Sequence, residues 1–251
     1  HNQIIKSEHL KTSNYLADID EWTEKNLMKL NQRKTMQILF NFNRDKQFTT
    51  EVELKKEPLQ IVDEVKLLGV IISKDLKWHK NTSYLTKKAN KKMRMLHIAA
   101  KFTRNREHLE HIYKTFVRSN LEFFSTVWHS SLTLTERQDL ERIQKAAVKV
   151  ILGNDYDSYT QALSDLKMES LNMRRENMAL KFAKKSLEND NFSKLFPLRD
   201  INHGMRVRKS EKYHVNNSKT NRYKNSAIPY LQRLLNKENL DKRQSFKRLV
   251  T

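Results

Sequence analysis

The sequence predicts an α+β protein that is predominantly helical, with a small antiparallel sheet, then a helical bundle and a basic C-terminal segment. The 251-residue chain has only three Gly and three Pro, so sharp turns are few and long helices are favoured. From Trp78 onward, apolar residues recur at helical spacing. Short stretches rich in β-branched and aromatic residues occur only between residues 35 and 73, which confines the expected sheet to that region.

The first thirty residues are expected to form a helix and its exit. Leu16, Ile19 and Trp22 recur at helical spacing with charged residues between them, so we expect these three side chains to pack inward. Asn26 is the expected helix stop, because Asn tolerates the left-handed conformation better than most residues.

Strands are predicted between residues 35 and 73. The stretch TMQILFNF (35–42) is one, and a weaker strand is expected at 48–54. LQIVD (59–63) and VKLLGVIIS (65–73) are interpreted as two strands around a tight turn. Gly69 falls inside the second of these, where a glycine indicates a bulge or the close approach of another backbone.

The helix that follows Trp78 is predicted to have two distinct faces. Its apolar residues step by three or four positions and form one stripe: Leu85, Ala89, Met93, Leu96 and Ala100. Basic residues form a second stripe, rotated away from the first: Lys87, Lys91, Arg94 and Lys101.

Several helices are predicted downstream. Residues 107–128 are apolar on most sides, so we expect this helix at the centre of a bundle. Thr135 and Gln138 have the spacing of a capping box for the next helix, and Gly153 is its expected end. The polar stretch 202–225 is interpreted as an extended arm that orders only with a partner. Further helices are expected at 159–166, 171–187 and 227–235.

The net charge of +20 is concentrated in two blocks. Residues 73–106 hold eleven Lys or Arg against one Asp, and residues 201–251 hold thirteen against three acidic residues. Each block thus carries a surplus of ten positive charges, which is typical of a surface for a polyanion. A generally basic, solvated surface is the plainer alternative. No membrane is expected as a partner, because no run of eighteen apolar residues occurs and the blocks carry few aromatic anchors at amphipathic spacing.

The stretch YLADID (15–20) raises the question of catalysis, because closely spaced aspartates are typical of polymerase metal sites. Such a site needs carboxylates that converge on two Mg²⁺ ions about 3.5–4 Å apart. On a helix, Asp18 and Asp20 point to nearly opposite sides. We therefore predict that both are helical, exposed and not catalytic.

No metal site is predicted. The sequence has no Cys, so thiolate ligands are excluded. His108 and His111 have no evident third ligand and are interpreted as surface residues. No Gly-rich loop for phosphates and no Gly-flanked nucleophile is present.

Five segments occur in an order that matches one known family. They are IDEWTEKNLMKLNQRKTMQILF (19–40), VKLLGVIISKDLKW (65–78), LERIQKAAVKVILG (140–153), RRENMALKFAKK (174–185) and NRYKNSAIPYLQRLLN (221–236). Together they resemble the C-terminal part of the reverse transcriptases of non-LTR (LINE-type, jockey-like) retrotransposons.

The resemblance implies a division of the chain into three parts: the end of a polymerase palm in residues 1–77, a helical thumb in 78–200, and a basic tail with a short helix in 201–251. It implies an RNA template and DNA primer duplex as partner. The fingers, the remaining palm and the catalytic aspartate pair would lie in a missing N-terminal portion, so the chain alone is expected to be inactive. No cofactor is expected in this portion, and Mg²⁺ is implied for the full-length parent.

The resemblance also implies roles for single residues. Lys34 matches the lysine of the motif after the catalytic hairpin, where a cation stabilises charge or donates a proton near pyrophosphate; a surface lysine in a turn is an equal alternative. Gly69 matches the primer-grip strand, where glycine lets the primer backbone approach. Phosphate contacts are expected from Lys87, Lys91, Arg94, Lys101, Arg206, Arg208, Lys209, Arg222 and Lys224.

Two alternatives stay open at this point. The chain is also consistent with a non-catalytic basic helical module that binds RNA or DNA in its own right, or with a degenerate element remnant.

Overall fold

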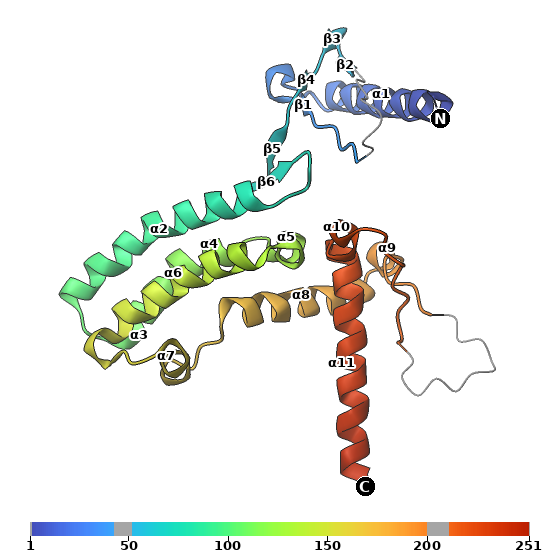
Figure 1. Ribbon diagram of the computed structural model, residues 1–251. Helices are drawn as coiled ribbons and strands as arrows, with labels where there is room; N and C mark the ends of the chain where they lie inside the picture. The colour runs from blue at the N-terminus through green and yellow to red at the C-terminus, as the bar shows by residue number, and fades with distance from the viewer. Residues whose placement is uncertain (1, 43–51, 200–210, 251) are drawn as a thin grey trace. The chain divides into compact units, whose positions relative to one another are not determined.

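The computed structural model of the chain describes residues 2–42, 52–199 and 211–250. Helices dominate these residues and the strands are short, so the fold is α+β and predominantly helical, as predicted. The chain divides into two compact units, His1–Asn81 and Thr82–Thr251 (Figure 1). The boundary expected between residues 77 and 78 lies close to this division. No helix within the described ranges is long and apolar enough to cross a membrane.

The first unit contains one long helix and three two-stranded ladders in place of a single antiparallel sheet. The helix is α1, Asn2–Lys25, and a 3₁₀ turn, η1 (Gln32–Lys34), follows it. β1 pairs with β4 in parallel, whereas β2–β3 and β5–β6 are antiparallel hairpins. The strands are β1 (Met36–Gln37), β2 (Glu53–Leu54), β3 (Glu57–Pro58), β4 (Gln60–Ile61), β5 (Glu64–Leu67) and β6 (Val70–Ser73).

Three of the predicted strands are shorter in the structure, and of 59–63 only β4 forms. Only β1 forms within 35–42, and β2 forms at the end of 48–54, of which residues 48–51 lie outside the described residues. The core of this unit is small, so little apolar surface is available for long strands to cover. It consists of Val52, Leu54 and Leu59, with Leu16 and Leu30 packed against them.

Gly69 lies in a hairpin turn and not inside a strand. The strand expected at 65–73 is two strands, and Leu67 pairs with Val70 across the two-residue turn Leu68–Gly69. Both turn residues have positive φ, 47° at Leu68 and 90° at Gly69, which is the geometry of a type I′ turn. The turn itself explains the glycine, since glycine adopts positive φ without a steric penalty.

The packed face of α1 differs from the prediction. Ile19 and Trp22 are 49% and 57% exposed, so the expectation that they are buried is wrong. The side that packs inward carries the partly buried Leu16 and the buried Thr23, which lie two helical turns apart on one face. The small core of the unit accepts only this narrow face, so Leu16 packs as predicted while Ile19 and Trp22 stay exposed.

The exit from α1 also differs in detail. Leu27 takes the left-handed conformation with φ of 56°, and Asn26 does not. The Asn26 side-chain amide instead donates a hydrogen bond to the Trp22 carbonyl at 2.8 Å. The same carbonyl also accepts the Asn26 backbone N–H at 3.1 Å, so both donors of Asn26 close the last turn of the helix.

The second unit consists of helices, with one isolated bridge between Leu198 and Tyr213 among its described residues. Helix α2, His79–Phe102, leads into it from the first unit. The longer helices that follow are α6 (Leu134–Leu152), α8 (Leu171–Leu187) and α11 (Ala227–Val250). The shorter ones are α3 (Arg106–Ile112), α4 (Ser119–Glu122), α5 (Ser125–Trp128), α7 (Tyr159–Asp165), α9 (Asp190–Ser193) and α10 (Asn221–Lys224). Two 3₁₀ turns complete it, η3 (His129–Ser131) and η4 (Gly153–Asp155).

The segment predicted as one central helix, 107–128, is interrupted twice. A π-helical stretch, η2, occupies Tyr113–Arg118, and the chain bends at Phe124, whose φ is 48°. The bend reorients α5, so that Trp128 is fully buried while Val127 is 42% exposed. The buried apolar side chains of this segment are Leu109, Tyr113, Val117, Leu121 and Trp128.

Helix α6 begins earlier than its predicted cap. Thr133 is the N-cap and Glu136 completes the capping box, in place of Thr135 and Gln138. Each of these two residues bonds to a backbone N–H of the other, which satisfies two donors at the helix start. Gly153 caps the other end with φ of 59°, as predicted.

Part of the segment expected as an arm is packed into a core. Tyr213 is 6% exposed, and its backbone N–H and C=O bond to the Asn236 side chain at 2.8 and 2.9 Å. Residues 202–210 lie outside the described residues. Figure 1 shows α11 crossing α8, with which it is in contact. The buried cluster there comprises Ala179, Ala183, Phe196, Tyr213, Leu231, Leu234 and Leu235.

Candidate nucleic-acid interface

Helix α2 separates an apolar stripe from a basic one. Its inner side carries Leu85, Ala89, Met93 and Leu96, each 5% exposed or less. The opposite side exposes all four residues of the predicted basic stripe, Lys87, Lys91, Arg94 and Lys101. The separation follows from sequence spacing alone, because residues three and four apart share a helix face.

The charges of this stripe are not neutralised within the unit. In the parts of the chain that the structure describes, none of the four side chains forms an ion pair or hydrogen bond. Exposed cations without acidic partners are available to an external polyanion, and they release its counterions on binding. We call this set, Lys87, Lys91, Arg94 and Lys101, the α2 basic stripe.

Apolar side chains lie beside the α2 basic stripe, which the sequence analysis did not single out. Met95, Ile98 and Phe102 are 41%, 46% and 85% exposed. Their spacing of three and four positions also indicates an apolar helix face. The longer apolar stripe through Leu96 is the stronger pattern on the same helix. Exposed apolar and aromatic side chains next to cations are typical of surfaces that stack on bases as well as bind phosphates.

The predicted tail residues are placed only in part. Arg222 and Lys224 are exposed on α10, which packs against α11. Arg206, Arg208 and Lys209 lie outside the described residues. The structure therefore places two of the five predicted tail cations on the surface of the second unit.

Lys34 and Gly69 belong to the first unit. Lys34 is exposed at the end of η1, where its backbone N–H donates to the Asn31 side chain at 3.2 Å. Its ammonium group has no ion pair among the described residues. Gly69 lies at a hairpin tip beside exposed Leu68. The primer-grip role that the resemblance implies for Gly69 would therefore belong to the β5–β6 turn and not to the middle of a strand.

The two aspartates of YLADID do not converge. Both lie within α1, where positions two apart are separated by about 200° around the axis. Asp18 is exposed, whereas Asp20 is partly buried and its Oδ1 lies 3.3 Å from Lys55 Nζ. The hydrogen bonds that Lys55 donates to Glu24 and Asp20 raise its pKa. The helical prediction for this stretch is confirmed, and the expected exposure holds for Asp18 only.

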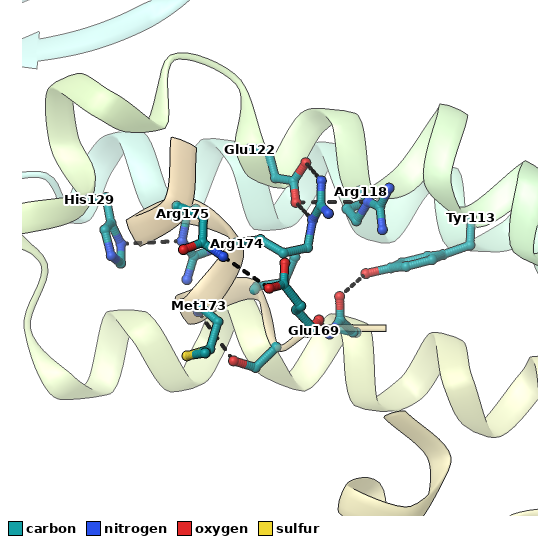
Figure 2. A network of polar contacts seen from close by, with 12 residues as sticks. Tyr113, Arg118, Glu122, His129, Glu169, Met173, Arg174 and Arg175 are labelled. Atoms are coloured by element: carbon teal, nitrogen blue, oxygen red, sulfur yellow. Dashed lines mark hydrogen bonds and ion pairs between the residues drawn. The ribbon is translucent and has the colours of Figure 1, made fainter. Parts of the chain in front are cut away.

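A buried polar network holds the helices of the second unit together (Figure 2). The Tyr113 hydroxyl donates to Gln144 at 2.7 Å, and the Gln144 amide donates to the Tyr159 hydroxyl at 2.9 Å. Tyr159 in turn donates to Glu141. Burial raises the pKa of both tyrosines well above its usual value, so they stay protonated donors. The chain of bonds connects the π-helical stretch with α6 and α7.

The same network contains a carboxylate shared by two arginines. Glu122 of α4 accepts from Nε and Nη2 of Arg174 on α8, the latter at 3.2 Å. Arg118 lies 3.8 Å from the same carboxylate, and Figure 2 shows both guanidinium groups beside Glu122. This bidentate pair fixes α8 against α4.

Arg175, the residue after Arg174, points into the core. It is fully buried, its guanidinium carbon lies 5.8 Å from the Trp128 ring centre, and Nε donates to His129. Burial lowers the pKa of Arg175 to about 10. Burial, followed by the charges of Arg175 and Arg137, lowers the pKa of His129 to about 3. His129 is therefore neutral at physiological pH and acts as an acceptor.

Two histidines lie on the surface of α3. His108 and His111 are exposed on α3, in agreement with their interpretation as surface residues. In the described part of the chain, no three His, Asp or Glu side chains gather as a metal site would require.

Comparison of the chain with protein-family models, with curated proteins and with solved structures gives no match.

Proposed function

We propose that this chain is the C-terminal palm and thumb portion of a non-LTR retrotransposon reverse transcriptase, and that it holds the RNA template–DNA primer duplex. The order of five sequence segments supports the family assignment. The observation that carries the binding role is the α2 basic stripe, four exposed cations without acidic partners opposite a buried apolar face.

The dimensions of the stripe suit a duplex backbone. Lys87 and Lys101 are separated by about 21 Å along the helix at 1.5 Å per residue. This length exceeds the width of a nucleic-acid groove, so the stripe has the length to contact phosphates on both sides of one. Phosphate contacts carry no base information, so binding is largely independent of sequence.

The test is fluorescence anisotropy with an RNA–DNA hybrid across a salt series. Each phosphate neutralised contributes about −0.9 to the log–log slope, so replacing Lys87, Lys91, Arg94 and Lys101 by Gln should flatten the slope by roughly three to four units. Circular dichroism should show an unchanged fold, because the buried stripe is untouched.

A charge-matched control removes four lysines outside both basic blocks. Lys167, Lys181, Lys185 and Lys194 are exposed in the same unit, and their replacement by Gln should leave the slope nearly unchanged. Equal slopes for the α2 variant and the wild type would refute the proposed binding role.

The family assignment has its own test. The reading frame upstream of His1 is expected to encode a Tyr-x-Asp-Asp hairpin. An upstream frame without such a hairpin would favour the independent RNA- or DNA-binding module instead.

A further inference from the structure

A cavity of about 340 Å³ opens where α2 ends, α3 begins and α6 ends. Its polar wall carries Arg104, Arg106 and Asp155, and its apolar wall carries Leu109 and Ile151. All of these residues belong to the second unit. The volume falls at the small end of the range for pockets that bind small organic molecules. The cavity adjoins the basic helix, since Ala100 and Thr103 at the end of α2 also line it.

The cavity carries one uncompensated positive charge. Asp155 pairs with Arg106, so these two charges cancel. Arg104 is exposed, and within the described ranges its guanidinium group has neither an ion pair nor a hydrogen bond. A free guanidinium fork is suited to an oxyanion, and to phosphate in particular, because it donates two parallel hydrogen bonds.

The remaining walls favour a ligand larger than phosphate. Leu109, Val150, Ile151 and Leu152 line one side of the cavity; Leu109 and Ile151 are only 2% and 4% exposed, so a ligand meets a narrow apolar strip there. The last turn of α6 also lies in the wall, and carbonyls in the last turn of a helix lack intrahelical donors. A matching ligand has an anionic end, an apolar ring and hydrogen-bond donors.

We infer that this cavity binds one nucleotide, with its phosphate on Arg104, its base against the Leu109 side and its hydroxyl or amino groups directed at the end of α6. In the context of the proposed function, on which this source of the ligand rests, it is the unpaired nucleotide at a duplex end held by the α2 basic stripe. The stripe ends at Lys101, three residues before Arg104, so a strand that leaves the duplex at this end meets the cavity next.

Isothermal titration of the whole chain with adenosine monophosphate tests the cavity directly. Binding is expected, and Arg104→Gln should weaken it about tenfold or more, the usual loss for a charge-assisted hydrogen bond. Ala100→Met fills the cavity from α2 with a good helix former and should abolish binding. Arg142→Gln, on the exposed side of α6 outside the cavity wall, removes the same charge and should change nothing.

Two further ligands distinguish a nucleotide from its parts. Inorganic phosphate and adenosine should each bind much more weakly than adenosine monophosphate. Equal binding of phosphate would reduce the cavity to an anion site and overturn the inference, and equal binding of adenosine would overturn the role of Arg104.

A comparison of duplex ends separates this inference from the proposed function. A hybrid with a one-nucleotide overhang should bind at least about fivefold more tightly than a blunt hybrid, in line with the stacking of one base. Ala100→Met should remove this preference and keep the blunt affinity. The α2 stripe variant should lose affinity for both hybrids and still bind adenosine monophosphate. If the wild type binds hybrids but neither the nucleotide nor the overhang, the inference fails and the proposed function stands.

Discussion

Arg175 donates a hydrogen bond from Nε to Nδ1 of His129 at 3.3 Å, in the interior of the second unit. The Nε2 atom of His129 and both terminal nitrogens of Arg175 have no hydrogen-bond partner among the described residues. A second positive charge on His129 would face the Arg175 guanidinium in a buried site, where like charges repel strongly. His129 is thus a neutral acceptor beside the Arg175 cation. This arrangement depends on pH, because protonation of His129 would remove the acceptor.

Stability should fall below about pH 6.5 because of His129. Its pKa is about 3 in the folded chain and 6.5 when unfolded, so the unfolded chain binds the extra proton between these values. The free energy of unfolding contributed by this group is fully present above pH 6.5. It falls as pH decreases, by up to about 1.4 kcal/mol per pH unit and roughly 5 kcal/mol in total by pH 3. Urea unfolding from pH 7 to pH 4 measures the slope.

Other carboxylates titrate in the same range, so a matched pair of variants isolates the effect. His129→Gln keeps an acceptor for Arg175 and does not titrate, so its stability should depend less steeply on pH. His108→Gln removes an exposed histidine and should keep the wild-type slope. Identical slopes for His129→Gln and the wild type would show that His129 is not buried in its neutral form.

The turn of the β5–β6 hairpin offers a stabilising substitution. Leu68 is 77% exposed and has φ of 47°, a conformation that costs a non-glycine residue about 1–2 kcal/mol. Asn before Gly is the preferred pair in a type I′ turn. Leu68→Asn should therefore stabilise the hairpin by about 1 kcal/mol, measured by amide exchange of β5 and β6. Leu67→Asn, one residue earlier in the strand, should not stabilise it.

The start of α6 can be tested at two threonines. Thr133→Ala removes the side-chain oxygen that accepts the Glu136 backbone N–H at the N-cap, and it should cost about 1 kcal/mol of unfolding free energy. Thr135→Ala lies inside the first turn, where alanine is the better helix former, and should be neutral or slightly stabilising. Denaturant unfolding of the two variants decides which threonine is the cap.

The sequence was sufficient for features that depend on local spacing. The two faces of α2 and the extent of α8 follow from periodicity along one helix. The cap of α6 shows the limit of such reasoning, because Thr133 with Glu136 and Thr135 with Gln138 both fit the capping pattern. In the structure Thr133 is the residue that caps the helix, and Leu132 directly before it is buried, 6% exposed.

Features that depend on distant contacts were out of reach. Ile19 and Trp22 have the spacing of a packed face, yet the core of their unit takes Leu16 and Thr23 instead. Arg175 and His129 are 46 residues apart, and nothing in either neighbourhood signals their contact. The cavity beside Arg104 combines the ends of α2 and α6, which are brought together only by the tertiary fold.

Phe102 provides a test of how the α2 surface binds nucleic acid. Its ring is 85% exposed between Lys101 and Thr103, close to the expected path of a strand end. Stacking on a base contributes about 1–3 kcal/mol and releases no counterions. Phe102→Ala should therefore weaken binding of the overhang hybrid by roughly 5- to 100-fold at every salt concentration and leave the salt slope unchanged.

Phe192→Ala is the matched control for this variant, because Phe192 is 50% exposed on α9, outside both basic blocks. It should bind the hybrid as the wild type does.

Sedimentation with phosphatidylserine vesicles tests whether Met95, Ile98 and Phe102 serve instead as membrane anchors, since a basic helix with apolar neighbours also fits an anionic membrane. Vesicle binding that is lost in Phe102→Ala, together with unchanged hybrid affinity, would assign this apolar line to a membrane and remove it from the nucleic-acid interface.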